Sequence, residues 1–127
     1  MTKALLDRTP PNDVKAEQGV LGSVLILPDA IDDLANILAA EDFHDDANAT
    51  FYGRIMAMHA AGEAIDITTL IDRLKANKEF DAIGGTPYLA AITNAVPNAA
   101  HVLYYANIVR QKAEQRSIIN AATMALG

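Results

Sequence analysis

The sequence predicts an all-α fold: a compact six-helix domain whose long C-terminal helix is the first arm of a helical hairpin. In most segments apolar residues recur three or four positions apart, the spacing of amphipathic helices. Prolines and glycines divide the first 97 residues into short helical stretches with short connections. From Asn98 to Leu126 there is neither residue, so one helix of about 25 residues, about 37 Å long, is expected there.

Three regions follow from this pattern. Residues 1–13 should form an extended N-terminal arm, because Pro10 and Pro11 hold the backbone out of a helix. Residues 14–97 should form a globular helical head, and residues 98–127 the first arm of the hairpin.

The first two helices of the head are predicted over residues 14–27 and 28–40. Asn12 or Asp13 can cap the first helix, and Pro28 suits the first turn of the second. Gly19 and Gly22 fall inside the first helix, where each weakens it by roughly 1 kcal/mol relative to alanine. We therefore expect the two glycines to permit close packing against another helix.

The remaining helices of the head have clearer end signals. The third is expected over residues 47–61, with Gly62 as its C-cap. The fourth is expected over residues 69–77, capped by Thr68 or Asp66. The fifth should start with Thr86 as N-cap and end before Pro97.

The long last helix carries two apolar stripes side by side, so more than one of its faces needs a partner. One stripe contains Val102, Tyr105, Val109 and Ile119, and the other contains Tyr104, Ile108, Ile118 and Ala122. Half of a helical hairpin has this pattern. We predict self-association through Tyr105, Val109, Ile119 and Ala122, which should be less buried within one chain than in a dimer.

Length, composition and charge restrict the class of protein. A chain of 127 residues fits one domain, and 51% apolar residues argue against intrinsic disorder. It has no cysteine, no apolar run long enough to span a bilayer, and no signal-peptide core, so a cytoplasmic protein without a membrane partner is expected. The net charge of −6 argues against broad affinity for nucleic acid.

No catalytic, cofactor-binding or metal-binding residues are predicted. The acidic stretch around Asp42 and Asp46 has the alternate spacing of a calcium loop, but Ala47 stands where the turn glycine is needed and Gly53 where the bidentate glutamate is needed. The three histidines lie on three different elements. Gly84-Gly85 lacks the lysine of a phosphate-binding loop, and no Ser-His-Asp set is evident.

A set of short motifs in a fixed order resembles the N-terminal domain of DnaB-family replicative DNA helicases, from about residue 10 to about residue 125. The motifs are Pro10-Pro11, Ala16-Glu17-Gln18 with Val20-Leu21-Gly22, Glu41-Asp42-Phe43, Gly62-Glu63 with Ile65-Asp66, Ile83-Gly84-Gly85 with Tyr88-Leu89, Val96-Pro97, Tyr104-Tyr105-Ala106, Ile108-Val109 and Arg116. The chain departs from the family at Lys15, where an acidic residue is common, at His44, where an aromatic usually follows the phenylalanine, and at Asn48, where histidine is frequent.

The resemblance implies a role in DNA replication. In that family the hairpins pair between subunits, and the domains form a collar on a hexameric ring. The collar binds the C-terminal domain of DnaG-type primase and contacts helicase loaders, and the ATP- and Mg-dependent motor that acts on DNA lies in a separate C-terminal domain. Among primase-binding positions, Tyr88 and Ile119 match in this sequence, whereas Ala125 is smaller than the aliphatic residue sometimes found there.

Two functions of different classes are thus considered. The favoured one is the collar domain of a replicative helicase, without catalysis of its own, working in the bacterial cytoplasm at the nucleoid-associated replisome. The alternative is a free-standing helical adaptor or nucleic-acid-binding module with the same fold. A reading frame that continues into a second helix and a Walker-type motor would distinguish the first from the second.

Overall fold

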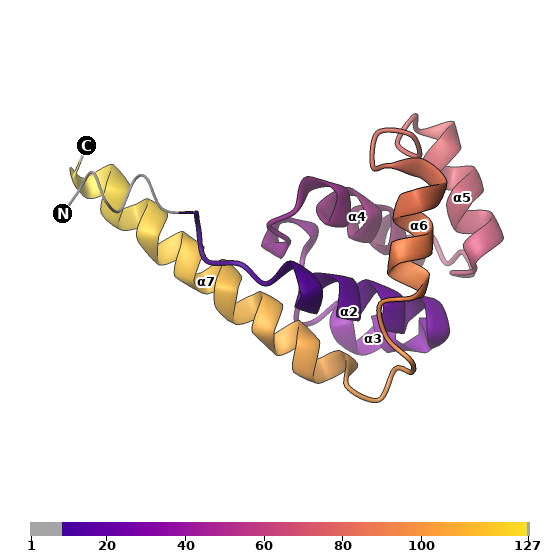
Figure 1. Cartoon of the computed structure of the whole chain (residues 1–127), viewed down its shortest axis with the longest axis horizontal. Coiled ribbons are helices and arrows are strands. Elements are labelled where there is room, and N and C mark those ends of the chain that lie inside the picture. Colours follow the sequence, from indigo (N-terminus) through magenta and orange to yellow (C-terminus); the bar gives the residue numbers. More distant parts are fainter. Residues whose placement is uncertain (1–8, 127) are drawn as a thin grey trace.

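Helices account for nearly all regular structure in residues 9–126, the part of the chain that the computed structural model describes, and this part contains no strand (Figure 1). The elements are α2 (Val14–Ile26), η1 (Pro28–Ala30), α3 (Ile31–Leu34), η2 (Ala40–Asp42), α4 (Asp46–Ala60), α5 (Ile67–Ala76), α6 (Gly85–Thr93) and α7 (Val102–Leu126). The all-helical prediction is confirmed. Of the predicted arms, residues 1–8 and Gly127 lie outside the described part, and the three-region division stays a prediction.

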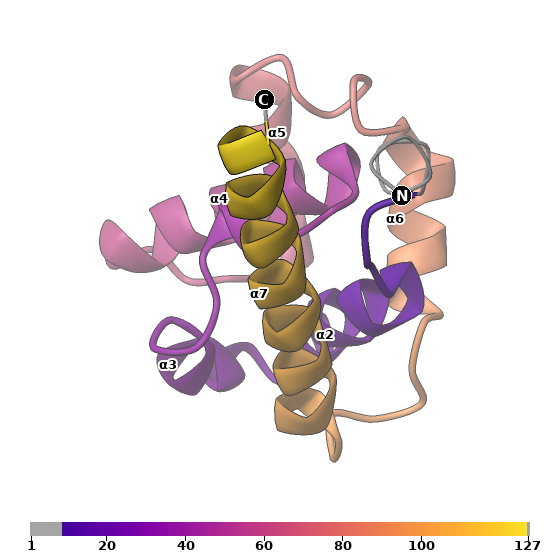
Figure 2. The same ribbon diagram turned by 90° about the vertical axis from the view of Figure 1, so that its left-hand side faces the viewer.

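Helix α2 is the centre of the fold. The Asp13 carboxylate accepts a hydrogen bond from the Ala16 amide at 3.0 Å and caps the helix, as the sequence predicts. Buried residues then occur around almost the whole circumference of α2. The reason is that α7 packs on one side of it and α4 and α6 on others (Figures 1 and 2).

Two glycines let these neighbours approach α2 closely, as predicted. A Cβ at Gly19 would lie 2.8 Å from Cδ2 of Tyr105 on α7. A Cβ at Gly22 would lie 2.7 Å from the carbonyl oxygen of Ile92 on α6. Both distances are shorter than ordinary van der Waals contact, so the packing of α7 and α6 on α2 requires glycine at both places.

The prediction of one long second helix over residues 28–40 is wrong. The segment forms η1 and α3, and α3 ends at Leu34. The following turn brings Leu38, 2% exposed, into the core. There the Leu38 carbonyl accepts the Tyr52 hydroxyl at 3.0 Å, so a side chain of α4 replaces the bond that a continuing helix would supply.

The helix ends of α4 and α5 follow local capping chemistry. Asp45 caps α4 through a 3.0 Å bond from the Asn48 amide, and Gly62 follows α4 with a φ of 72°. Asp66 caps α5 by accepting from the Thr69 amide at 2.9 Å, which starts that helix two residues earlier than predicted.

The prediction of Thr86 as N-cap of the fifth helix is wrong. Helix α6 begins at Gly85, and its N-cap is Gly84 with a φ of 115° and no side-chain cap bond. The left-handed conformation suits glycine, and it places the N-cap two residues before Thr86.

Helix α7 has an inner and an outer half. It begins at Val102, and Val102, Ala106 and Val109 are buried against the head. Arg110 and Arg116 still contact the connecting segments of the head, and the last turns of the helix then extend away from it (Figure 1). The described residues of the N-terminal arm run beside α7 (Figure 1), and the Pro11 carbonyl accepts a hydrogen bond from Arg116 of that helix.

Candidate interaction surface

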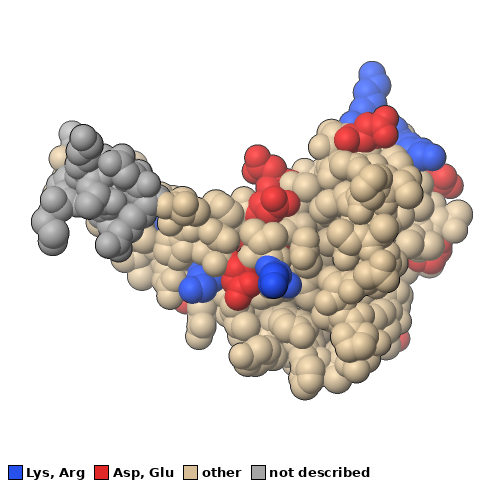
Figure 3. Space-filling model, viewed as in Figure 1, with Lys and Arg blue, Asp and Glu red and all other residues tan. Residues whose placement is uncertain are grey.

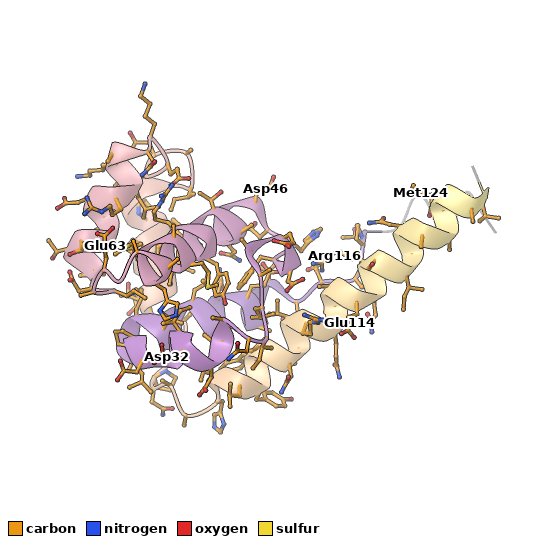
Figure 4. The ribbon with its side chains drawn as sticks, turned by 180° about the vertical axis from the view of Figure 1, so that it is seen from behind. Asp32, Asp46, Glu63, Glu114, Arg116 and Met124 are labelled. Carbon is orange, nitrogen blue, oxygen red and sulfur yellow. The ribbon has the colours of Figure 1, made fainter. Side chains whose placement is uncertain are left out.

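Two arginines attach the middle of α7 to the connecting segments of the head. Arg116 donates from Nη1 to the Pro11 carbonyl at 2.8 Å and from Nη2 to the Asp42 carbonyl at 2.6 Å. One turn and a half earlier, Arg110 donates to the Ile37 carbonyl at 3.1 Å. Figure 4 shows Arg116 between the head and the free end of α7 that carries Met124. Because a guanidinium has several donors in a fixed plane, Arg116 can bridge two backbone segments and orient the helix.

The outer half of α7 exposes large apolar side chains. Ile118 is 69% exposed, Met124 82% and Leu126 64%. On the inner half, Tyr104 is 66% exposed. Tyr104 and Ile118 belong to the second stripe of the sequence pattern, and the head leaves both exposed, whereas Ile108 of the same stripe packs partly against the core.

The four residues predicted for self-association lie in different environments. Val109 is 1% exposed and leaves no surface for a second chain, so the prediction for this residue is wrong. Its burial follows from the close approach of α7 to α2 at Gly19, where the half-buried ring of Tyr105 lies. Tyr105 and Ile119 are half-buried and Ala122 is exposed, so self-association through these three stays a prediction.

The predicted primase-binding residue Tyr88 is half-buried on α6. Its ring stands edge-on to the Phe51 ring, with centroids 5.6 Å apart. Its hydroxyl donates to Oδ1 of Asn48 at 2.6 Å. Burial first, and then the nearby negative charges of Asp45 and Glu17, raise the pKa of Tyr88, so the phenol keeps its proton.

A buried carboxylate stands behind this tyrosine. Glu17 on α2 is 2% exposed, and its oxygens accept from the His44 amide at 2.7 Å, the Asp45 amide at 3.2 Å and Nδ2 of Asn48 at 3.0 Å. Three donors compensate the carboxylate for the loss of water. No role for Glu17 is predicted from the sequence, although Val20 and Leu21, one helical turn further on, are apolar, and a glutamate on an apolar helix face indicates a buried, hydrogen-bonded carboxylate.

The structure does not bring the two predicted primase-binding positions together within one chain. Tyr88 lies on α6, one of the helices of the head. Ile119 lies on the outer half of α7.

The polar residues examined for metal binding have structural partners. Asp42 accepts from the Ala39 amide at 2.8 Å, and Asn48 belongs to the Glu17 network. His59 faces Asp32 at 3.8 Å on the surface. Within residues 9–126 no three histidine, aspartate or glutamate side chains are placed to hold a metal ion. None of the described helices combines the length and apolar character needed to cross a membrane.

Charges are scattered over the face seen in Figure 3, where basic and acidic side chains alternate and acidic ones gather near the junction of the head and α7. Several of the arginines are paired: Arg54 with Glu79 at 2.9 Å and Arg73 with Glu63 at 2.7 Å. The described surface in this view shows no basic groove.

Comparison with known proteins gives consistent matches. The family model for the DnaB-like helicase N-terminal domain matches residues 9–111. A replicative DNA helicase DnaB from Leifsonia xyli is 38% identical over 92% of this chain and 26% of its own length. A replicative DNA helicase DnaB from Geobacillus stearothermophilus is 37% identical over 97% of this chain and 27% of its own length. The chain therefore spans about a quarter of the length of these relatives.

A solved structure agrees in fold. The crystal structure of the N-terminal domain of DnaB helicase from Mycobacterium tuberculosis matches with a TM-score of 0.88 and 38% identity, over 93% of this chain and 82% of that one. The resemblance inferred from the order of short motifs is thereby confirmed. The chain belongs to the family of DnaB-like helicase N-terminal domains.

Proposed function

We propose that this chain is the collar domain of a bacterial replicative helicase, which acts in the cytoplasm at the nucleoid-associated replisome. It contributes subunit assembly, as a dimer and within a hexamer, and it binds the C-terminal domain of primase and a helicase loader. The longer protein of which it forms part unwinds DNA with ATP and Mg in a separate motor domain. The relatives named as replicative DNA helicases support this, since the chain corresponds to about a quarter of their length.

One structural observation carries the assembly role. The outer half of α7 exposes Ile118 and Met124 on a helix that Arg116 holds at a fixed angle to the head. An apolar helix face held out from a domain gains stability when another helix covers it. We favour this role over a nucleic-acid-binding module because the net charge is −6.

The primase-binding role rests on Tyr88 and Ile119. Both are half-buried, so each packs partly on its own chain and keeps surface for a partner. A tyrosine that becomes fully desolvated at the centre of an interface contributes strongly to binding.

The test is titration of the C-terminal domain of the primase from the same bacterium against the full-length helicase. Tyr88→Ala and Ile119→Ala should each weaken binding by about 1–3 kcal/mol without changing helicity. Ile67→Ala, at an exposed aliphatic on α5 that is assigned no role, is the control and should bind as the parent does. Unaltered affinity for both Tyr88→Ala and Ile119→Ala would place the primase site elsewhere.

A further inference from the structure

The surroundings of Tyr88 fix the direction in which its hydroxyl proton points. It donates its single proton to Oδ1 of Asn48, which is 1% exposed, at 2.6 Å. The ring is held by Phe51, whose centroid lies 5.6 Å away. The position of the phenol on α6 therefore depends on a side chain of α4.

The amide of Asn48 can take only one orientation in this network. Its Nδ2 donates to Oε1 of Glu17 at 3.0 Å. An ionised carboxylate accepts hydrogen bonds and donates none, so the amide nitrogen must face Glu17 and the amide oxygen must face Tyr88. A flipped amide would set an oxygen against the carboxylate and leave the Tyr88 proton without an acceptor.

Glu17 is itself fixed from the other side. The amides of His44 and Asp45 donate to its two oxygens at 2.7 and 3.2 Å. The chain of hydrogen bonds thus runs from the connector before α4, through α2 and α4, to α6. Each member is satisfied, and a fully satisfied buried network holds its members in one geometry.

We propose that Glu17 and Asn48 are positioning residues for partner binding at Tyr88: they hold its ring in place and turn its hydroxyl proton inward, so that the partner must donate any hydrogen bond to this phenol. The proposal rests on the proposed role of Tyr88 in binding primase. A hydroxyl has one proton and two lone pairs, so the Tyr88 oxygen, its proton already used, can only accept from a partner. The nearby charges of Asp45 and Glu17 favour a cationic donor, a lysine or arginine of the primase domain.

A double-mutant cycle separates this role from a purely structural one. The C-terminal domain of the primase from the same bacterium is titrated calorimetrically into the full-length helicase carrying Tyr88→Phe, Asn48→Ala, or both. Each single change should weaken binding about three- to tenfold, the loss expected of one hydrogen bond. The double variant should bind no more weakly than the weaker single variant. Additive losses, or an Asn48→Ala variant that binds like the parent, would overturn the proposal.

Conservative variants guard against simple misfolding. Asn48→His keeps a ring nitrogen that donates to Glu17 and one that accepts from Tyr88, so it should bind within about twofold of the parent. Glu17→Gln should weaken binding, because its amide no longer forces the orientation of Asn48. Tyr52→Phe removes a hydroxyl that donates to backbone carbonyls elsewhere in the core and should leave primase affinity unchanged. If Asn48→Ala fails to fold, weak binding by Asn48→His refutes the proposal.

The donor on the partner is found by the same logic. Lysines and arginines on the primase domain are replaced singly by alanine, and one of them should weaken the parent complex while having no effect on the Tyr88→Phe complex. If none is coupled to Tyr88→Phe, the acceptor role of the phenol is wrong. If Tyr88→Ala itself binds as tightly as the parent, the proposed primase role of Tyr88 fails, which is a separate result from the failure of Asn48 to couple.

Discussion

Replacing Gly22 by alanine should destabilise the domain, whereas the same replacement at Gly53 should stabilise it. Both glycines lie inside helices, α2 and α4, so alanine gains about 1 kcal/mol of helix propensity at either position. At Gly53 the new Cβ would lie 3.5 Å from the nearest atom, Cβ of Ala40, which is ordinary contact. The full gain of about 1 kcal/mol is therefore expected there.

At Gly22 the new methyl group meets backbone. Its Cβ would lie 2.7 Å from the carbonyl oxygen of Ile92, and this oxygen cannot rotate away as a side chain can. Inserting a methylene-sized group into packed structure costs about 1–3 kcal/mol. The propensity gain of about 1 kcal/mol offsets part of this, so the net loss should be between about 0 and 2 kcal/mol. The free energies of unfolding of Gly22→Ala and Gly53→Ala should thus differ by about 1–3 kcal/mol.

The assay is urea unfolding of the 127-residue chain, followed by circular dichroism at 222 nm, a wavelength that reports helix. Equal slopes in urea are required before the midpoints are compared. The reasoning is refuted if Gly22→Ala is as stable as Gly53→Ala, because the close approach of α6 to α2 would then have no energetic consequence. A loss at Gly22 would also indicate that the placement of α6, the helix that carries Tyr88, depends on this contact.

Three further outcomes are expected. The purified 127-residue chain should neither hydrolyse ATP nor unwind DNA, and turnover that persists after contaminating ATPases are removed would contradict its assignment as a collar domain. Sedimentation at high micromolar concentration should show self-association. Ile118→Asp should weaken it more than Ile119→Asp does, because Ile118 is 69% exposed and Ile119 is half-buried. A strict monomer that neither change affects would count against the assembly role. Arg116→Ala should lower the free energy of unfolding by about 1–3 kcal/mol, because its hydrogen bonds to the carbonyls of Pro11 and Asp42 are lost. Arg116→Lys should not restore this stability, because one ammonium group cannot bridge both segments. Chemical denaturation of the two variants measures the difference.

Local signals were sufficient for most of the secondary structure and for the family. Asp13 and Asp66 lie directly before apolar-periodic segments, and a carboxylate there bonds the free amides of the next turn whatever the rest of the fold does. Gly62 ends α4 for an equally local reason, its positive φ. The fixed order of short motifs identified the family without a structure. These features depend on a few residues that are adjacent in the chain, so they can be predicted from the sequence alone.

Contacts between distant segments decided the rest. The two stripes of α7 look alike in sequence. The packing of the inner half of α7 on α2 buries Val109, and Ile118, further along the helix, stays exposed. The carbonyl of Leu38, after the end of α3, is satisfied by the Tyr52 hydroxyl, 14 residues further along. The role of Glu17 depends on donors 27 to 31 residues away. Apolar periodicity predicts that a helix face will be buried, but it does not predict which element will cover that face, because the hydrophobic effect is not directional. The covering element is determined by the shapes of the packed helices and by the hydrogen bonds between them.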